Sequence, residues 1–295
     1  MWLLFALLAA IGYATVHILD EYCVGDVFEK PWFGVVTSSF TSLIVFQTIP
    51  FVAPFVSWSI PSTSLILMAF FAGVLFQCSQ YFYFYALSYS EAGIIAAYWN
   101  LIPMMLPIAS FIVFGKVFGI PEYLGITILI ASSVGMCLVD SNLKTKWLAF
   151  FLIFIGSILQ VTGYLIEDIV FDHAPLYLSF LTFSAGLICA GISPLLFRKF
   201  RKSFLRHWKK LATLLRFFLV IEAINLVAIV LGQKSIALGE PSMVAAIETT
   251  IPIHVFVINL ILLKFFKRGN TASLHKINFK VSFVAFMILG VWLIA

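Results

Sequence analysis

Residues 91–103 read EAGIIAAYWNLIP, and residues 240–252 read EPSMVAAIETTIP. At a fixed offset of 149 residues, the two stretches share an initial glutamate, a central Ala-Ala pair and a final Ile-Pro pair. A second match, at an offset of 151 residues, places the Gly-Tyr pair at 12–13 on the Gly-Tyr pair at 163–164. Two matches at nearly the same offset predict an internal repeat of about 145–150 residues.

The composition is that of a membrane protein. Of the 295 residues, 62% are hydrophobic and 11% are charged, whereas about 25% of a soluble domain is charged. A helix needs about 20 mostly apolar residues to cross a hydrocarbon core of ~30 Å. The apolar runs here are too long and too uniform for the alternating strands of a membrane barrel. The expected membrane helices are residues 2–19, 32–56, 62–88, 92–115, 121–139, 147–170, 175–197, 211–236, 240–263 and 277–295.

The repeat and the apolar runs together predict the architecture. We expect two halves, residues 1–143 and residues 144–295, with five membrane helices in each. Because five is an odd number, the second half enters the membrane from the opposite side. The sequence thus predicts an all-α integral membrane protein with about ten transmembrane helices in two five-helix inverted repeats. Many transporters with inverted repeats bind their substrate near the midplane, between the halves.

The basic residues predict an orientation. Of the 18 Lys and Arg residues, all but Lys116 and Lys234 are assigned to loops that follow odd-numbered helices, with the densest group from Arg198 to Lys210. Because cytoplasmic loops carry an excess of Lys and Arg, we expect both termini outside. Solvated loop charge also accounts for the net charge of +5, so no nucleic-acid partner is expected.

Signals for other classes of function are weak. The four cysteines are scattered, without the spacing of a metal site or a disulfide framework. The sequence contains no P-loop, HExxH or GxSxG pattern. His17 and Asp20 have HxxD spacing, a weak hint of an intramembrane enzyme. We therefore expect no enzyme activity, no catalytic residue, no cofactor and no metal.

Several stretches resemble a known family, the EamA-type members of the drug/metabolite transporter superfamily. They are ALSYSEAG at 86–93 running into WNLIP at 99–103, ALGEP at 237–241 running into Ile251-Pro252, and the opening MWLL through HILDEY at 17–22. The resemblance covers the whole chain and implies the fold and a transport function, but not a substrate. The chain departs from the family at Gly115-Lys116, where an acidic residue is common, and in the expected orientation, since many members keep their termini in the cytoplasm.

Polar residues inside the spans predict a central site. An ionisable side chain in a span costs about 2.5–3.5 kcal/mol on insertion scales and usually faces the bundle interior or a wet cavity. Helical spacing places these residues on shared faces. The candidates for substrate binding or proton coupling are His17, Gln77, Tyr81, Trp99, Asn100, Gln160, Tyr164, Glu167, Glu222, Asn225 and Glu248. Glu222 and Glu248 lie well inside spans without a sequence-local cation, which makes them the strongest candidates.

Structural roles are the alternative for several of these residues. Glu167 and Asp168 lie close to the end of their run, so a position at the membrane interface is as much expected as a position in the site. Gln and Asn side chains often only join neighbouring helices. We expect Asp20 and Glu21 to lie in a loop.

Two functions fit these features. Carboxylates outnumber cationic groups on the polar faces, which favours a cationic or zwitterionic small metabolite carried by a secondary transporter with alternating access between the repeats. The alternative is a flippase for a lipid-linked substrate, with the basic group Arg198–Lys210 at headgroup level. The expected partners are the lipid bilayer and a small-molecule substrate, and a homodimer is also compatible. We expect a multi-pass protein of a bacterial or archaeal plasma membrane.

Overall fold

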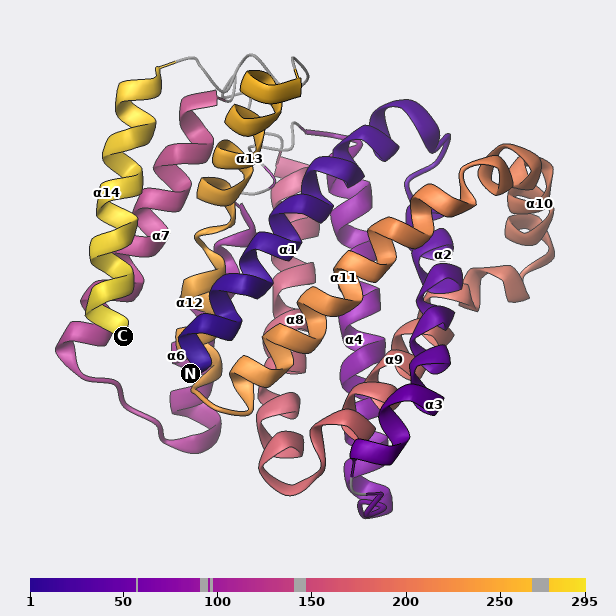
Figure 1. Cartoon of the computed structure of the whole chain (residues 1–295), viewed down its shortest axis with the longest axis horizontal. Helices are drawn as coiled ribbons and strands as arrows, with labels where there is room; N and C mark the ends of the chain where they lie inside the picture. Colours follow the sequence, from indigo (N-terminus) through magenta and orange to yellow (C-terminus); the bar gives the residue numbers. More distant parts are fainter. Residues whose placement is uncertain (57, 91–94, 96–97, 141–146, 267–275) are drawn as a thin grey trace.

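The computed structural model describes residues 1–56, 58–90, 95, 98–140, 147–266 and 276–295. Within these residues every regular element is a helix, and the helices pack side by side in one bundle (Figure 1). Nine described stretches are long and apolar enough to cross a membrane. The chain is therefore an all-α, multi-pass membrane protein, as predicted. The stretches are α1 (Trp2–Tyr22), α2 with α3 (Trp32–Phe55), α4 (Thr63–Leu87), α7 (Ile120–Asp140), α8 (Trp147–His173), α9 (Leu176–Ile192, continued to Leu196), α11 (Leu215–Ile236), α12 with α13 (Pro241–Phe265) and α14 (Ile277–Ile294).

The predicted count of ten helices depends on α6 (Leu101–Phe114), a shorter apolar helix of 14 residues. It covers only part of the predicted run 92–115. Glu91, Ala96 and Ala97, which carry part of the repeat, lie outside the described residues, as does the predicted boundary at 143/144. Both termini lie toward the same end of the bundle (Figure 1), which is compatible with an even number of crossings. The ten-helix count and the repeat stay predictions.

The run 240–263 is not one helix, contrary to expectation. It divides into α12 (Pro241–Glu248) and α13 (Ile251–Phe266). Pro252 lacks an N–H group and its ring clashes with the carbonyl one turn earlier, which breaks the helix. The hydroxyls of Thr249 and Thr250 donate to the carbonyls of Ala246 and Ile247, each at 2.7 Å. In the first half, Asn100 lies in a turn directly before α6, so the matched prolines of the repeat both follow an interruption.

The second predicted span is also divided. It consists of α2 (Trp32–Thr41), a 3-10 segment (Ser42–Thr48), α3 (Ile49–Val52) and a second 3-10 segment (Ala53–Phe55). Pro50 and Pro54 stand at the starts of the last two pieces, where a missing N–H group does not cost a helical hydrogen bond. A π-helical turn (Cys23–Val27) follows α1.

One predicted loop region and one lysine counted among the loop charges are helical. The basic stretch expected as a loop forms α10 (Arg198–Thr213), which buries Phe204 and Leu211. It lies at the outer edge of the bundle, beyond α2 (Figure 1). Lys280, assigned to a loop from its charge, lies in α14 and is buried, with its ammonium group 5.6 Å from the centre of the Phe256 ring.

Small residues set the closest helix contacts. A Cβ atom at Gly73 of α4 would overlap the Phe183 carbonyl oxygen of α9, and one at Gly186 of α9 would overlap the Phe70 carbonyl oxygen of α4. Small residues at such crossings let membrane helices approach closely. Among helices far apart in the sequence, α1 packs against α11 and α8 packs against α4. An inverted repeat would exchange these two pairs, which is compatible with the predicted symmetry.

Candidate functional site

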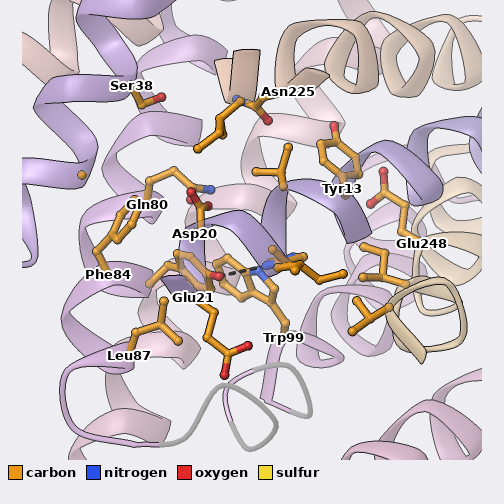
Figure 2. Close-up of a pocket in the computed structure, with 18 of the residues that line it drawn as sticks. Tyr13, Asp20, Glu21, Ser38, Gln80, Phe84, Leu87, Trp99, Asn225 and Glu248 are labelled. Carbon is orange, nitrogen blue, oxygen red and sulfur yellow. Dashed lines mark hydrogen bonds between the residues drawn. The ribbon is translucent and has the colours of Figure 1, made fainter. Parts of the chain in front are cut away.

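A cavity of about 500 Å³ lies in the centre of the bundle. Residues of α1, α2, α4, α6, α7, α8, α11, α12 and α13 line it, so both predicted halves contribute to its wall. Figure 2 shows Asp20, Glu21, Asn225 and Glu248 around this space, with the indole of Trp99 between them. Glu21, in the last turn of α1, both lines the cavity and is exposed. The cavity therefore reaches the end of the bundle at which α1 finishes.

The structure brings most of the predicted site residues together. Those that line the cavity are His17, Gln77, Trp99, Asn100, Gln160, Tyr164, Glu222, Asn225 and Glu248. Tyr81 lies elsewhere, because its hydroxyl turns toward α9 and donates to the Gly191 carbonyl at 2.9 Å. Glu167 is buried behind the cavity wall and accepts a hydrogen bond of 2.7 Å from Gln233. It does not extend to the interface, which was one of its two expected positions.

Glu248 is held at the interruption between α12 and α13. It is the last residue of α12, and its carboxylate accepts a hydrogen bond of 2.6 Å from the Tyr164 hydroxyl. Tyr13 of α1 lines the same part of the cavity (Figure 2). The break in the helix thus presents a carboxylate to the cavity between side chains from α1 and α8.

Glu222 is more fully paired than Glu248. Its carboxylate accepts hydrogen bonds from the hydroxyls of Ser38 at 2.8 Å and Ser42 at 2.6 Å, and from the Asn225 amide at 3.3 Å. Ser38 lies on α2 and Ser42 begins the 3-10 segment, so these bonds join α11 to the divided second span. Only 2% of Glu222 is exposed. The geometry gives it a structural role beside any role in binding.

An aromatic wall faces the carboxylates. His17 Nδ1 lies 2.9 Å from the Tyr83 hydroxyl, and the two rings meet edge to face. Tyr83 in turn stacks on Trp99, with ring centres 5.8 Å apart and planes inclined by 10°. Phe84 continues this surface. Aromatic faces of this kind attract cations through the ring quadrupole.

Besides Asn225, the three other amide side chains among the predicted residues also line the cavity. Gln77 donates to the Val35 carbonyl at 3.2 Å and to Ser39 Oγ at 2.9 Å. Gln160 donates to Ser79 Oγ at 3.1 Å. Asn100 is buried in the turn before α6. Gln77 and Gln160 therefore join neighbouring helices while also facing the cavity.

Several cavity residues are absent from the predicted set. Asp20 and Glu21, expected in a loop, belong to α1 and line the cavity. Tyr83, rather than Tyr81, is the tyrosine of the aromatic run that meets it. Gln80 and Leu87, at helical steps of three and four from Tyr83, share its face and line the cavity with it. The small polar residues Thr37, Ser38, Thr41, Ser133 and Thr249 also line the cavity and gave no signal.

The ionisable side chains that line the cavity are mainly acidic. Four carboxyl-bearing residues contribute to it, and none of the described lining residues is Lys or Arg. The acidic members are Asp20, Glu21, Glu222 and Glu248. Within the described part of the chain, no group of three or more His, Cys, Asp and Glu is placed to hold a metal ion. The cavity is suited to a positive charge supplied by a solute or a proton.

Ionic contacts lie beyond the other end of the cavity. Lys116 Nζ lies 3.0 Å from the Asp168 carboxylate and 2.7 Å from that of Glu240. Burial lowers the pKa of Lys116, but the hydrogen bonds and charges of Glu240 and Asp168 outweigh this effect and raise it. Lys116 follows α6, Asp168 lies on α8, and Glu240 directly precedes α12. The contacts therefore link the two predicted halves.

The described spans and this polar cavity define a multi-pass membrane protein with an internal site. The model of the EamA-like transporter family, which is part of the drug/metabolite transporter superfamily, matches residues 1–138, and this confirms the predicted resemblance over that part of the chain. This family, together with the many apolar helices, supports a transporter of that type.

Known structures agree with the fold. One solved structure, titled only as a crystal structure of a protein, is 12% identical to this chain and covers 98% of each chain with a TM-score of 0.65. At that identity it shows the fold alone. A search of the curated proteins found no match.

Proposed function

We propose that this protein is a secondary transporter that carries a small cationic or zwitterionic metabolite through the central cavity. The observation that carries the proposal is the combination of a cavity of about 500 Å³ with four carboxyl-bearing residues and, among its described lining residues, no Lys or Arg. A buried carboxylate without a cationic partner is costly. A bound cation or proton would offset that cost.

The size and walls of the cavity favour a small organic solute. Pockets for small molecules usually measure about 300–1,000 Å³, and this cavity lies within that range. Tyr83, Trp99 and Phe84 supply aromatic surface opposite Glu248. An ammonium group between a carboxylate and aromatic faces gains from both charge attraction and cation–π contact.

Alternating access would use the contacts between the halves. The cavity reaches one end of the bundle near Glu21, while the ionic contacts of Lys116 join the halves beyond its other end. Opening that other end would require these contacts to separate. The divided stretch α12–α13 supplies Glu248, and discontinuous helices near the midplane are a common feature of transporter sites.

The energy source and location follow as parts of the proposal. The sequence lacks a P-loop, so we infer that transport is driven by a solute or ion gradient, with Glu248 as the favoured site for a coupled proton. We propose no enzymatic step. The inferred location is a bacterial or archaeal plasma membrane.

A ligand screen on the purified full-length protein tests the proposal. Thermal unfolding would be measured with size-matched amines, quaternary ammonium ions, amino acids and carboxylic acids. A ligand present at 100 times its Kd stabilises the folded state by about 2.7 kcal/mol. We expect stabilisation by cations or zwitterions and none by the carboxylic acids. Stabilisation only by an anionic, lipid-linked carrier would contradict the proposal and favour a flippase.

A further inference from the structure

The helix α10 (Arg198–Thr213) carries basic residues on one side and aromatic residues on the other. The helix contains seven Lys and Arg residues, no Asp and no Glu. Lys202, Arg206 and Lys209 follow one another at steps of four and three, so they share one face. Phe204 and Leu211 lie on the opposite side and are buried. The exposed basic residues are Arg198, Lys199, Arg201, Lys202, Arg206, Lys209 and Lys210.

The aromatic side fixes α10 against the first turns of a membrane span. The Phe204 ring lies 5.6 Å from that of Phe33 and 6.0 Å from that of Phe40, both on α2. Phe200 meets Trp32, the first residue of α2, at 5.4 Å. Because α2 begins the second candidate span, these contacts hold α10 at the depth where that span enters the membrane.

The basic side has no protein partner in the described part of the chain. There, the ion pair of α10 is made by His207, whose Nε2 lies 2.6 Å from the Glu29 carboxylate. None of the seven Lys and Arg residues forms a described ion pair. Like charges so close together repel one another and favour an external anionic partner.

The surroundings of the basic face are those of a membrane interface. Phe197, Leu205 and Trp208 are 65%, 60% and 41% exposed, and α10 lies at the lateral edge of the bundle, outside α2 (Figure 1). A basic helix with exposed Trp, Phe and Leu lies in the plane of the lipid headgroups. Each Lys or Arg near an anionic membrane surface strengthens binding by about fivefold.

We propose that α10 is a docking surface for the anionic headgroups of membrane phospholipids. The apolar side anchors the helix to α2, and the basic side binds lipid phosphates along that edge of the protein. This assignment depends on the membrane fold and is independent of the solute that the central cavity binds.

Lipid titration of the full-length protein tests the assignment. The protein would be held in neutral detergent micelles and titrated with phosphatidylglycerol or phosphatidylcholine, with thermal unfolding as the first readout. We expect stabilisation by phosphatidylglycerol that falls as salt is raised. Brominated phosphatidylglycerol should quench a tryptophan signal that disappears in Trp208→Phe, which locates the lipid at α10.

Two charge-matched variants decide where the lipid binds. The double variant Lys202→Gln/Arg206→Gln should need about thirtyfold more phosphatidylglycerol for half of the stabilisation. Lys264→Gln/Lys276→Gln removes the same charge from exposed positions in α13 and directly before α14, and should stay within about twofold of the wild type. The conservative variant Lys202→Arg/Arg206→Lys should also retain binding, which separates charge loss from misfolding. Equal effects of the two charge-removing variants, or equal stabilisation by the two lipids, would overturn the assignment.

Discussion

Glu248 and Tyr164 show how single residues define the site. The glutamate ends a helix that Pro252 interrupts, and the tyrosine hydroxyl on α8 donates to its carboxylate at 2.6 Å. This hydrogen bond fixes the direction of the carboxylate toward the cavity. Bonds to charged groups contribute about 1.5–3 kcal/mol, so the orientation depends on the tyrosine hydroxyl.

Tyr164→Phe should weaken binding of a cationic ligand by about tenfold, because Glu248 loses its fixed direction. Thermal-shift titration measures the change. Tyr81→Phe is the matched control, since it removes a hydroxyl that bonds the Gly191 carbonyl outside the cavity. It should lower thermal stability while leaving ligand affinity within twofold. Equal losses of affinity in the two variants would show that Tyr164 acts only on stability.

The sequence identified most of the polar side chains at the cavity, for a physical reason. Ionisable and amide groups inside spans need an interior position, so Glu222, Glu248 and Gln160 could be selected without a structure. The direction of an individual aromatic residue could not. Whether Tyr81 or Tyr83 meets the cavity depends on where α9 packs against α4, and the sequence contains no local sign of that packing.

At the scale of elements, α4 and α9 cross at glycines. Gly73→Ala or Gly186→Ala would place a methyl group on a backbone carbonyl of the other helix. We expect each to destabilise the protein by about 1–3 kcal/mol or more, as overpacking does, measured as a lower midpoint of thermal unfolding. Gly163→Ala is the control, because its Cβ would lie 3.8 Å from the Ala72 carbonyl oxygen, an ordinary contact. If Gly163→Ala destabilises as much as Gly73→Ala, the crossing does not set the packing.

The ionic contacts of Lys116 make a prediction about the closed end of the cavity. The charged groups are partly exposed, so their loss should shift the opening equilibrium by about 1 kcal/mol at most, or about fivefold. In a variant with its native cysteines replaced by serine, Ala245→Cys reports access to the cavity wall. Lys116→Gln should speed its labelling by an impermeant maleimide from the side of the termini by up to about fivefold. Lys116→Arg should not, and an unchanged rate in Lys116→Gln would exclude Lys116 as a closing contact.

Elements also show the limits of prediction from sequence. The prolines at 103 and 252 lie just after both interruptions, but they did not predict them, because a proline does not end every helix and Pro107 lies inside α6. The amphipathic pattern of α10 was equally present, but its dense charge resembles a solvated loop until the aromatic cluster on α2 is known. Tertiary packing decided that element.

For the whole molecule, the charge distribution predicts that both termini lie outside and α10 lies inside. Single cysteines placed at Ala295 and Leu205, both exposed, test this in intact bacterial cells with an impermeant maleimide. We expect labelling at 295 and none at 205 before the cells are opened. The reverse pattern would invert the orientation, and labelling at both positions would contradict the three crossings expected between them, namely α11, α12 with α13, and α14.

Transport by reconstituted protein tests the central claim most directly. Uptake of the best stabilising cation from the ligand screen would be measured in proteoliposomes with and without a pH gradient. The proteoliposomes would contain the wild type, Glu248→Gln or Asp172→Asn. Asp172→Asn is the control, because it removes an exposed carboxylate that does not line the cavity. We predict gradient-dependent uptake that falls at least tenfold in Glu248→Gln and is unchanged in Asp172→Asn. Uptake equal to that of empty liposomes, or uptake unaffected by Glu248→Gln, would contradict transport through this cavity by this carboxylate.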